Sequence, residues 1–196
     1  LAATEKTLTM PVSKPCFGVG FKEEPLPAGD LRTEALYDLV LSCIVGGMSL
    51  LYRRLYDEGL VNPGFGGEVL RVDGCCCILF TGESDVPDTV RQLLLDEIAR
   101  VRAAGVDREV FPLCKNEKYG QLIENLENVE DSASQMADFA LSGQTVAQQI
   151  SMLAGLTAED ADAALQHILC TDRMASMYIL PDGTAQAAEE DEEEEE

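Results

Sequence analysis

The sequence has 196 residues, of which 46% are hydrophobic and 26% are charged, and it contains no tryptophan. This composition is ordinary for a globular chain, and one main domain with a sizeable core is expected. The 36 acidic residues outnumber the 14 basic ones, which gives a formal net charge of −22. A surface this acidic repels phosphate groups and therefore argues against nucleic acid as a partner.

The seven cysteines do not follow a disulfide or metal-binding pattern. Their number is odd, three are consecutive (Cys75, Cys76 and Cys77), and no pair has CxxC spacing. Neighbouring residues of a strand point to opposite faces, so the triplet cannot present three thiolates to one metal. We therefore expect a reducing, cytoplasmic location. No apolar run approaches membrane-spanning length and no signal peptide is recognisable, so no membrane partner is expected.

The composition along the chain predicts three parts. Residues 1–15 are polar and include two prolines, so they are expected to form an interdomain linker that can add an edge strand. The main domain, residues 16–183, opens with a strand at 16–24 in which large and small residues alternate. Asp30 then caps a helix that ends at a Gly-Gly pair. Residues 184–196 are expected to be a disordered acidic tail, because the last eight are all acidic. A start at Leu rather than Met suggests a processed protein or a fragment of a longer one.

The stretch SLLYRRLYDEGLVNPGFGG, residues 49–67, predicts a second helix with an abrupt end. Leu50, Leu51 and Leu55 are expected to fall on one helical face, and Gly59 supplies the left-handed position of a Schellman motif. Two strands follow, GEVLRV and CCCILFTG. The Asp73-Gly74 pair between them is a strong hairpin signal.

The CCCILF strand is apolar on both sides, so it lacks the alternation of a strand that exposes one face to water. Two explanations remain open. Either a partner domain covers its second face, or the strand is central and curls beneath a loop.

Helices are predicted to fill the chain between the hairpin and the last strand, RMASMYIL. Asp85 and Asp107 are expected to cap two of them, and the second continues, with a bend near Asn128. Two shorter helices begin near Thr145 and at Thr157, where T-A-E-D forms a capping-box pattern. This order predicts an α+β fold, in which helices are layered on one face of a largely antiparallel sheet.

Few residues suit catalysis. The single histidine, His167, is expected to be solvated, and one imidazole cannot supply the three protein ligands of a catalytic zinc. A Cys–His pair would need Cys16 or Cys114, yet both lie in apolar patterns, and only Lys115 is an adjacent basic residue. The glycines of residues 64–67 precede a strand, which is the wrong order for a phosphate loop. No catalytic residue is predicted in this chain.

Six segments, in this order, resemble the second, C-terminal half of a pitrilysin/insulinase-family zinc metallopeptidase, of the bacterial, processing-protease-like branch. They are GFKEEPLPAGD, SLLYRRLYDEGLVNPGFGG, DGCCCILFTGESD, LLLDEIARVRAAGVDREVF, GLTAEDADAALQHIL and MYILPDG. The resemblance covers about residues 14–183. In that family an H-x-x-E-H motif in the first half holds the zinc, and this sequence contains no such motif.

The resemblance implies that the chain is the substrate-enclosing C-terminal domain of a zinc endopeptidase. Its partners would be an N-terminal catalytic half of the same polypeptide and a peptide substrate. Zinc would lie in that missing half, so this chain is expected to hold no cofactor and to be inactive alone. The alternative is a non-catalytic assembly module that keeps the fold, as family members in respiratory complexes do. The doubly apolar strand also makes a homodimer an expected partner.

The resemblance further implies candidate substrate-binding residues. In many family members an Arg follows the leucine that ends the second helix, and a Tyr at the strand entry also reaches the scissile peptide. Here Leu55 is followed by Tyr56, and Asn62 takes the place of the tyrosine. Tyr56, Asn62 and Arg53 are therefore the candidates. Three alternatives stay open: Tyr56 packs on the core, Asn62 shapes a turn, and Arg53 is solvated beside Arg54.

Overall fold

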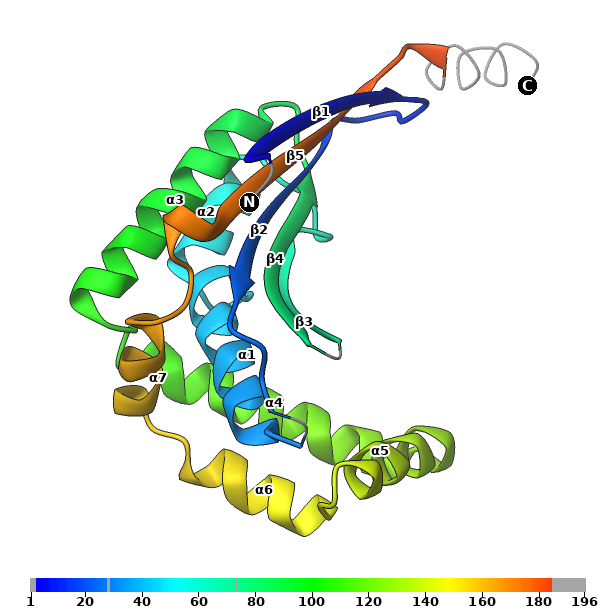
Figure 1. Cartoon of the computed structure of the whole chain (residues 1–196), viewed down its shortest axis with the longest axis vertical. Helices are drawn as coiled ribbons and strands as arrows, with labels where there is room; N and C mark the ends of the chain where they lie inside the picture. The colour runs from blue at the N-terminus through cyan, green and yellow to red at the C-terminus, as the bar shows by residue number, and fades with distance from the viewer. Residues whose placement is uncertain (1–2, 28, 73, 185–196) are drawn as a thin grey trace.

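The computed structural model describes residues 3–27, 29–72 and 74–184, which form a five-stranded sheet with helices on one face (Figure 1). The sheet order is β1-β5-β2-β4-β3. Neighbouring strands are antiparallel except for β1 and β5, which are parallel. The predicted α+β class is confirmed. The strands are β1 (Glu5–Met10), β2 (Cys16–Glu23), β3 (Gly66–Val72), β4 (Cys75–Glu83) and β5 (Met174–Pro181).

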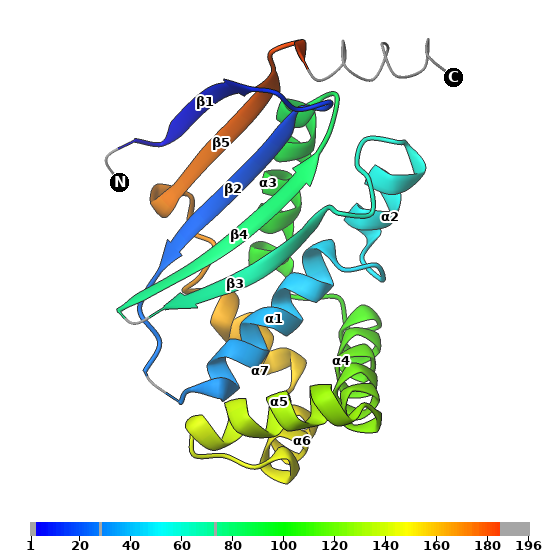
Figure 2. The same cartoon turned by 90° about the vertical axis from the view of Figure 1, so that its right-hand side faces the viewer.

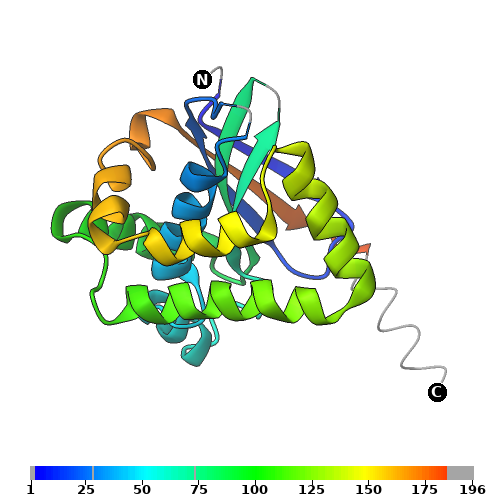
Figure 3. The same cartoon turned by 90° about the horizontal axis from the view of Figure 1, so that it is seen from below.

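The helices form two groups. α1 and α3 lie against the sheet, whereas α4, α5 and α6 gather at the end of the molecule below the β3–β4 hairpin (Figures 1 and 3). A turn of 3-10 helix, η1 (Thr171–Arg173), leads into β5. The helices are α1 (Leu31–Val45), α2 (Leu50–Asp57), α3 (Pro87–Ala104), α4 (Val110–Glu127), α5 (Val129–Leu141), α6 (Val146–Gly155) and α7 (Ala158–Leu165).

The core lies between the sheet and the helices, and the alternation along the strands determines which residues enter it. The large residues of β2 and β4 point to the helices, where they pack against apolar residues of α1 and α3. These buried strand residues are Phe17, Val19, Phe21, Cys76, Ile78 and Phe80. The residues between them, Gly18 and Gly20 of β2 and Cys77 and Leu79 of β4, point to the opposite face.

Most of the predicted helix ends are confirmed. The Asp30 carboxylate accepts a hydrogen bond from Thr33 N at 3.1 Å, and Thr145 and Thr157 both form capping boxes. The end of α2 is a Schellman motif, in which Leu60 N donates to Leu55 O and Gly59 has a φ of 67°.

Two expectations about helix ends are corrected. Asp85 does not cap α3, which begins with Pro87 and has no side-chain cap; instead Val86 N donates to the Ser84 hydroxyl at 3.1 Å. The long helix that Asp107 begins is two helices, because Asn128 has an extended backbone (φ −94°, ψ 128°). The Asn128 side chain then accepts the first free N–H groups of α5, so the same residue ends one helix and caps the next.

Asp73 of the predicted hairpin and the acidic tail from residue 185 onward lie outside the described residues. The hairpin strands themselves pair as predicted, from Gly66 with Thr81 to Val72 with Cys75.

No single helix among the described residues is long and apolar enough to cross a membrane. α1 and α2 together reach that length and composition, with a 42° bend between them. Most of their apolar side chains, among them Leu39, Ile44, Leu51 and Leu55, belong to the core described above, whereas Leu50 is exposed.

The left-handed glycine at the end of α2 provides a test of the Schellman motif. A Cβ on Gly59 would meet no atom within 4 Å, so a Gly59→Ala change should act only through its positive φ. We expect it to lower the free energy of unfolding by roughly 1 kcal/mol, measured by urea denaturation. Gly47→Ala is the matched control, because Gly47 has equally open surroundings and no positive φ. An equal loss in both variants would contradict the assignment.

Candidate functional site

The second face of the sheet is open: no described helix crosses it (Figure 2). The apolar CCCILF strand of the sequence is β4, and one of its two faces lies on this open side of the sheet. Its residues Cys76 and Ile78 are buried beneath the helices, whereas Cys77 and Leu79 are half-buried on the open face. No described loop or helix provides the cover that the apolar pattern predicts.

A groove of about 620 Å³ runs over this open face, with β2 as its floor and β4 and β5 at its sides. Apolar side chains and bare backbone make up most of its lining, and charged groups lie at its rim. The residues that line it are Ala3, Glu5, Lys6, Cys16, Phe17, Gly18, Gly20, Asn62, Gly64, Leu79, Thr81, Gly82, Glu83, Ala175, Ser176, Met177 and Ile179. A pocket with a mostly apolar lining and few polar groups is the usual form of a binding site.

Of the three predicted binding residues, Asn62 lines this groove. Its Nδ2 donates to Glu83 Oε2 at 2.7 Å, and its Oδ1 accepts from Gly64 N at 3.0 Å. The second bond shapes the turn before β3, as one of the open alternatives supposed. The first bond was not foreseen, and it fixes a carboxylate at the end of the groove.

Tyr56 and Arg53 are exposed on α2 and are not among the residues that line the groove. The Tyr56 ring stacks on Tyr52 at 6.1 Å between centroids, and Tyr52 in turn stacks on Phe65. The neighbouring Arg54 pairs with Glu58 one helical turn away. Substrate binding by all three residues stays a prediction.

The thiols do not form a reactive Cys–His pair. Burial, together with the charge of Glu83, raises the pKa of the Cys16 thiol in the groove. A hydrogen bond from Cys43 lowers the pKa of Cys114, but Cys114 is completely buried in the core. Lys115 donates to the carbonyls of Ala154 and Leu156, so it holds the end of α6 instead of activating the thiol.

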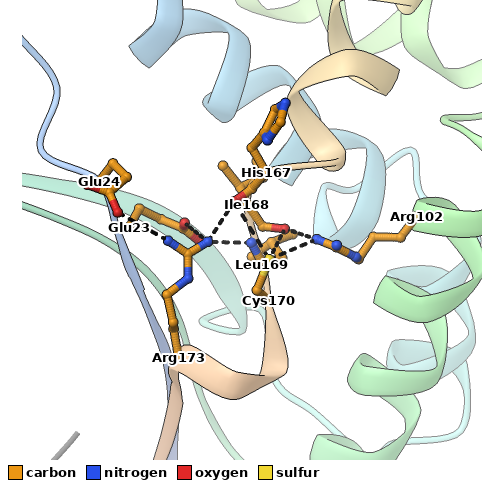
Figure 4. Close-up of polar contacts among 8 residues, drawn as sticks. All are labelled: Glu23, Glu24, Arg102, His167, Ile168, Leu169, Cys170 and Arg173. Carbon is orange, nitrogen blue, oxygen red and sulfur yellow. Dashed lines mark hydrogen bonds and ion pairs between the residues drawn. The ribbon is translucent and has the colours of Figure 1, made fainter.

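The donor set does not fit a zinc ion. The described residues contain no group of three or more His, Cys, Asp or Glu side chains that could hold a metal. His167 is exposed, and Figure 4 shows its ring pointing away from the nearby charged residues. We therefore assign no reaction step to a metal in this chain, and its lack of zinc stays a prediction.

A buried carboxylate holds the start of β5 in place (Figure 4). Glu23 is 4% exposed, and its Oε1 accepts from Leu169 N at 2.8 Å. Leu169 has a φ of 56°, a left-handed conformation that costs free energy in a residue with a Cβ. The Glu23 bond stabilises this conformation. Burial raises the pKa of Glu23, whereas the Leu169 and Arg173 contacts oppose the rise.

Two arginines complete this cluster. Arg173 lies 3.2 Å from Glu23 Oε2 and also donates to His167 O at 2.6 Å, and Arg102 donates to Ile168 O. Glu23, Arg173 and Arg102 thus hold the backbone of residues 167–169, in the segment that connects α7 to β5. Since Ala175 and Met177 of β5 line the groove, the cluster determines the position of one groove wall. No sequence signal indicates this cluster, because Lys22, Glu23 and Glu24 have the composition of an ordinary polar strand end.

No family model matches the sequence. Among curated proteins, the chain is 26% identical over 182 residues to the uncharacterized zinc protease YmfH of Bacillus subtilis, and the match covers 90% of this chain and 42% of YmfH. Among solved structures, an M16-like peptidase from Alicyclobacillus acidocaldarius has a TM-score of 0.86 and 26% identity, over 91% of this chain and 44% of that one. The chain spans less than half the length of both relatives.

A third relative shares the fold at lower identity. The inactive peptidase domain of a zinc protease from Bordetella parapertussis has a TM-score of 0.71 and 15% identity, over 89% of this chain and 94% of that one. The fold and the open groove thus define a peptidase-like α+β domain. The predicted resemblance to the pitrilysin/insulinase family is confirmed, because the chain is similar to M16-like zinc peptidases over nine-tenths of its length.

The raised pKa of Glu23 predicts a pH-dependent stability. A carboxyl whose pKa is raised in the folded state favours folding when protonated, and this contribution is lost as the pH rises through the folded pKa. The stability of the wild type relative to Glu23→Gln, which cannot titrate, should therefore fall as the pH rises from about 4, the ordinary range of a glutamate carboxyl, to neutrality. Urea denaturation at several pH values measures the difference.

Glu24→Gln serves as the control, because Glu24 is the exposed neighbour of the same arginine. Its stability relative to wild type should change little over the same pH range. A difference between wild type and Glu23→Gln that stays constant or grows with pH would show that burial does not raise this pKa.

Proposed function

We propose that this chain is the substrate-enclosing half of a two-part zinc peptidase, and that its open sheet face forms one wall of the peptide chamber. The observation that carries the proposal is the apolar groove of about 620 Å³ on a sheet face that no described element covers. Large exposed apolar surfaces are uncommon on isolated domains and generally mark interfaces or binding sites. Exposed apolar residues extend this surface on both sides of the groove, among them Leu8, Met10, Leu70 and Val72.

The lengths of the relatives support a division into two halves. YmfH is named as a zinc protease, and this chain matches 42% of it. The described residues of this chain offer no metal-binding cluster. The proposal therefore places the hydrolytic metal in a separate, preceding half, and gives this chain the C-terminal position that the sequence predicts.

The contribution of such a wall would be to hold the substrate, not to break the bond. A low-polarity groove excludes water and strengthens the electrostatic interactions made inside it. An extended peptide could lie along β2, whose Gly18 and Gly20 project no side chain. Asn62 lies at one end of this path, where its amide and the Glu83 carboxylate offer polar contacts.

The first test concerns the chain alone. We expect the purified 196-residue chain to bind no stoichiometric zinc and to hydrolyse no peptide, because one exposed histidine cannot supply a zinc site. Metal analysis and a fluorogenic-peptide assay measure both. Addition of an H-x-x-E-H half, as one polypeptide or in trans, should give chelator-sensitive hydrolysis. Inactivity of the complete polypeptide with zinc bound would instead favour a non-catalytic assembly module.

The second test concerns the predicted contacts in the complete polypeptide. Asn62→Ala and Tyr56→Phe should each lower peptide turnover by roughly tenfold, the effect of a lost transition-state contact, and Tyr56→Phe should do so without lowering stability. Arg54→Ala is the control, since it removes only the exposed pair with Glu58 on the same helix. Wild-type turnover in both test variants would show that α2 and the following turn have a structural role only.

A further inference from the structure

The floor of the groove is open because two positions of β2 have no side chain. Gly18 and Gly20 lie on the open face, where Gly18 pairs with Thr81 of β4 and Met177 of β5, and Gly20 pairs with Leu79 and Ala175. A Cβ on Gly18 would approach no heavy atom closer than 3.9 Å, and one on Gly20 none closer than 3.6 Å. Neither residue has a positive φ. Crowding and backbone conformation therefore do not require glycine at these positions.

Glycine inside a strand weakens the strand, and it commonly marks a place where a ligand or another backbone approaches closely. The two glycines here leave a trough along the middle strand, and the nearest atoms above it belong to Leu79, Thr81 and Cys77. Each glycine leaves room for a Cβ-sized group beside Leu79, and the groove of about 620 Å³ above them can hold an aliphatic side chain. An extended segment that lies over β2 can enter it.

A fixed negative charge lies at one end of this trough. Glu83 pairs with Cys16 in the β2–β4 register, two residues beyond Gly18, which is roughly 7 Å along the strand. The Asn62 amide, which carries no charge of its own, holds Glu83 Oε2 through a hydrogen bond of 2.7 Å. Glu83 and Thr81 share the open face, because side chains alternate along a strand.

The other charged groups on this face give the groove a polarity. Lys6 of β1 shares the open face, because it pairs with Met177 of β5, whereas the adjacent Glu5 pairs with Ser176 and alternates to the other face. Lys22 shares the open face at the opposite end of β2, and Glu68 lies on β3 opposite Leu79. Without the eight acidic residues at its end, the chain still has 28 acidic residues against 14 basic ones, a net charge of −14. This field favours a cationic ligand at the Glu83 end.

From this arrangement we infer that the groove recognises an extended peptide with an aliphatic side chain in the Gly18–Gly20 trough and a lysine or arginine two residues away, paired with Glu83. Residues i and i+2 of an extended peptide point to the same side, which matches the spacing between the trough and Glu83. Asn62 is a positioning residue that acts through Glu83. The inference rests on the proposed function, because it takes the open face as a peptide-binding wall.

Binding of short peptides to the 196-residue chain tests the inference. The probes are fluorescein-labelled octapeptides of glycine and serine that carry a leucine and, two residues away in either direction, an arginine, a glutamine or a glutamate. Fluorescence anisotropy should show that the arginine peptide binds about fivefold more tightly than the glutamine peptide, and that the glutamate peptide binds most weakly. Added salt should reduce the difference.

Four variants connect the binding preference and the trough to the named residues. Glu83→Gln should remove the preference for arginine, and Asn62→Ala should reduce it. Glu68→Gln removes a carboxylate from the same sheet face and should keep the preference, which separates Glu83 from the general acidity of the chain. Gly20→Val should weaken binding of all three peptides, because it fills the trough.

The outcomes distinguish this inference from the proposed function. Equal binding of the three peptides, or a preference that Glu83→Gln retains, would overturn the inference while leaving a peptide-binding wall in place. If Gly20→Val leaves binding unchanged, the trough does not hold the leucine and the inference is overturned. If none of the peptides binds, both the inference and the peptide-binding wall are contradicted.

Discussion

The alternation of large and small residues along β2 is the constraint on which the rest of the structure depends. β2 is the middle strand, so its two faces decide what lies on the two sides of the sheet. Phe17, Val19 and Phe21 enter the core, and the residues between them include Gly18 and Gly20. A slip of one residue in register would exchange the two faces, which would expose the aromatic residues and bury bare backbone. The same alternation therefore buries the helix side of β2 in the core and leaves its other face without large side chains.

The buried Glu23 cluster extends this constraint to β5. The carboxylate ends β2 on the helix side, and it holds the left-handed Leu169 and Arg173 immediately before β5 begins. An ionised carboxylate at this depth raises the free energy of the folded state unless it is paired. For this reason burial raises the pKa of Glu23. The cluster links the strand that forms the groove floor to the strand that forms one of its walls. Groove shape and fold stability are thus coupled through one side chain.

An open apolar sheet face is unfavourable for a domain that remains alone in water, because its exposed side chains invite association. Relatives more than twice as long as this chain offer a physical reason for it, since a second half could cover the face and enclose the groove. Under that proposal, the chain contributes shape, exclusion of water and a fixed charge to a chamber. The hydrolytic groups would lie elsewhere.

The sequence by itself determined the order and type of nearly every element, because periodicity, capping residues and glycines act over a few neighbouring positions. The Schellman end at Gly59, the capping boxes and the large-small alternation of β2 are all local signals of this kind. It also indicated an apolar second face on β4. Only the tertiary structure decided that β5 lies between β1 and β2, that Glu83 is held by Asn62, and that Glu23 supports Leu169. These contacts join residues 21 to 146 positions apart, or strands from opposite ends of the chain, and no local pattern specifies which distant partners meet.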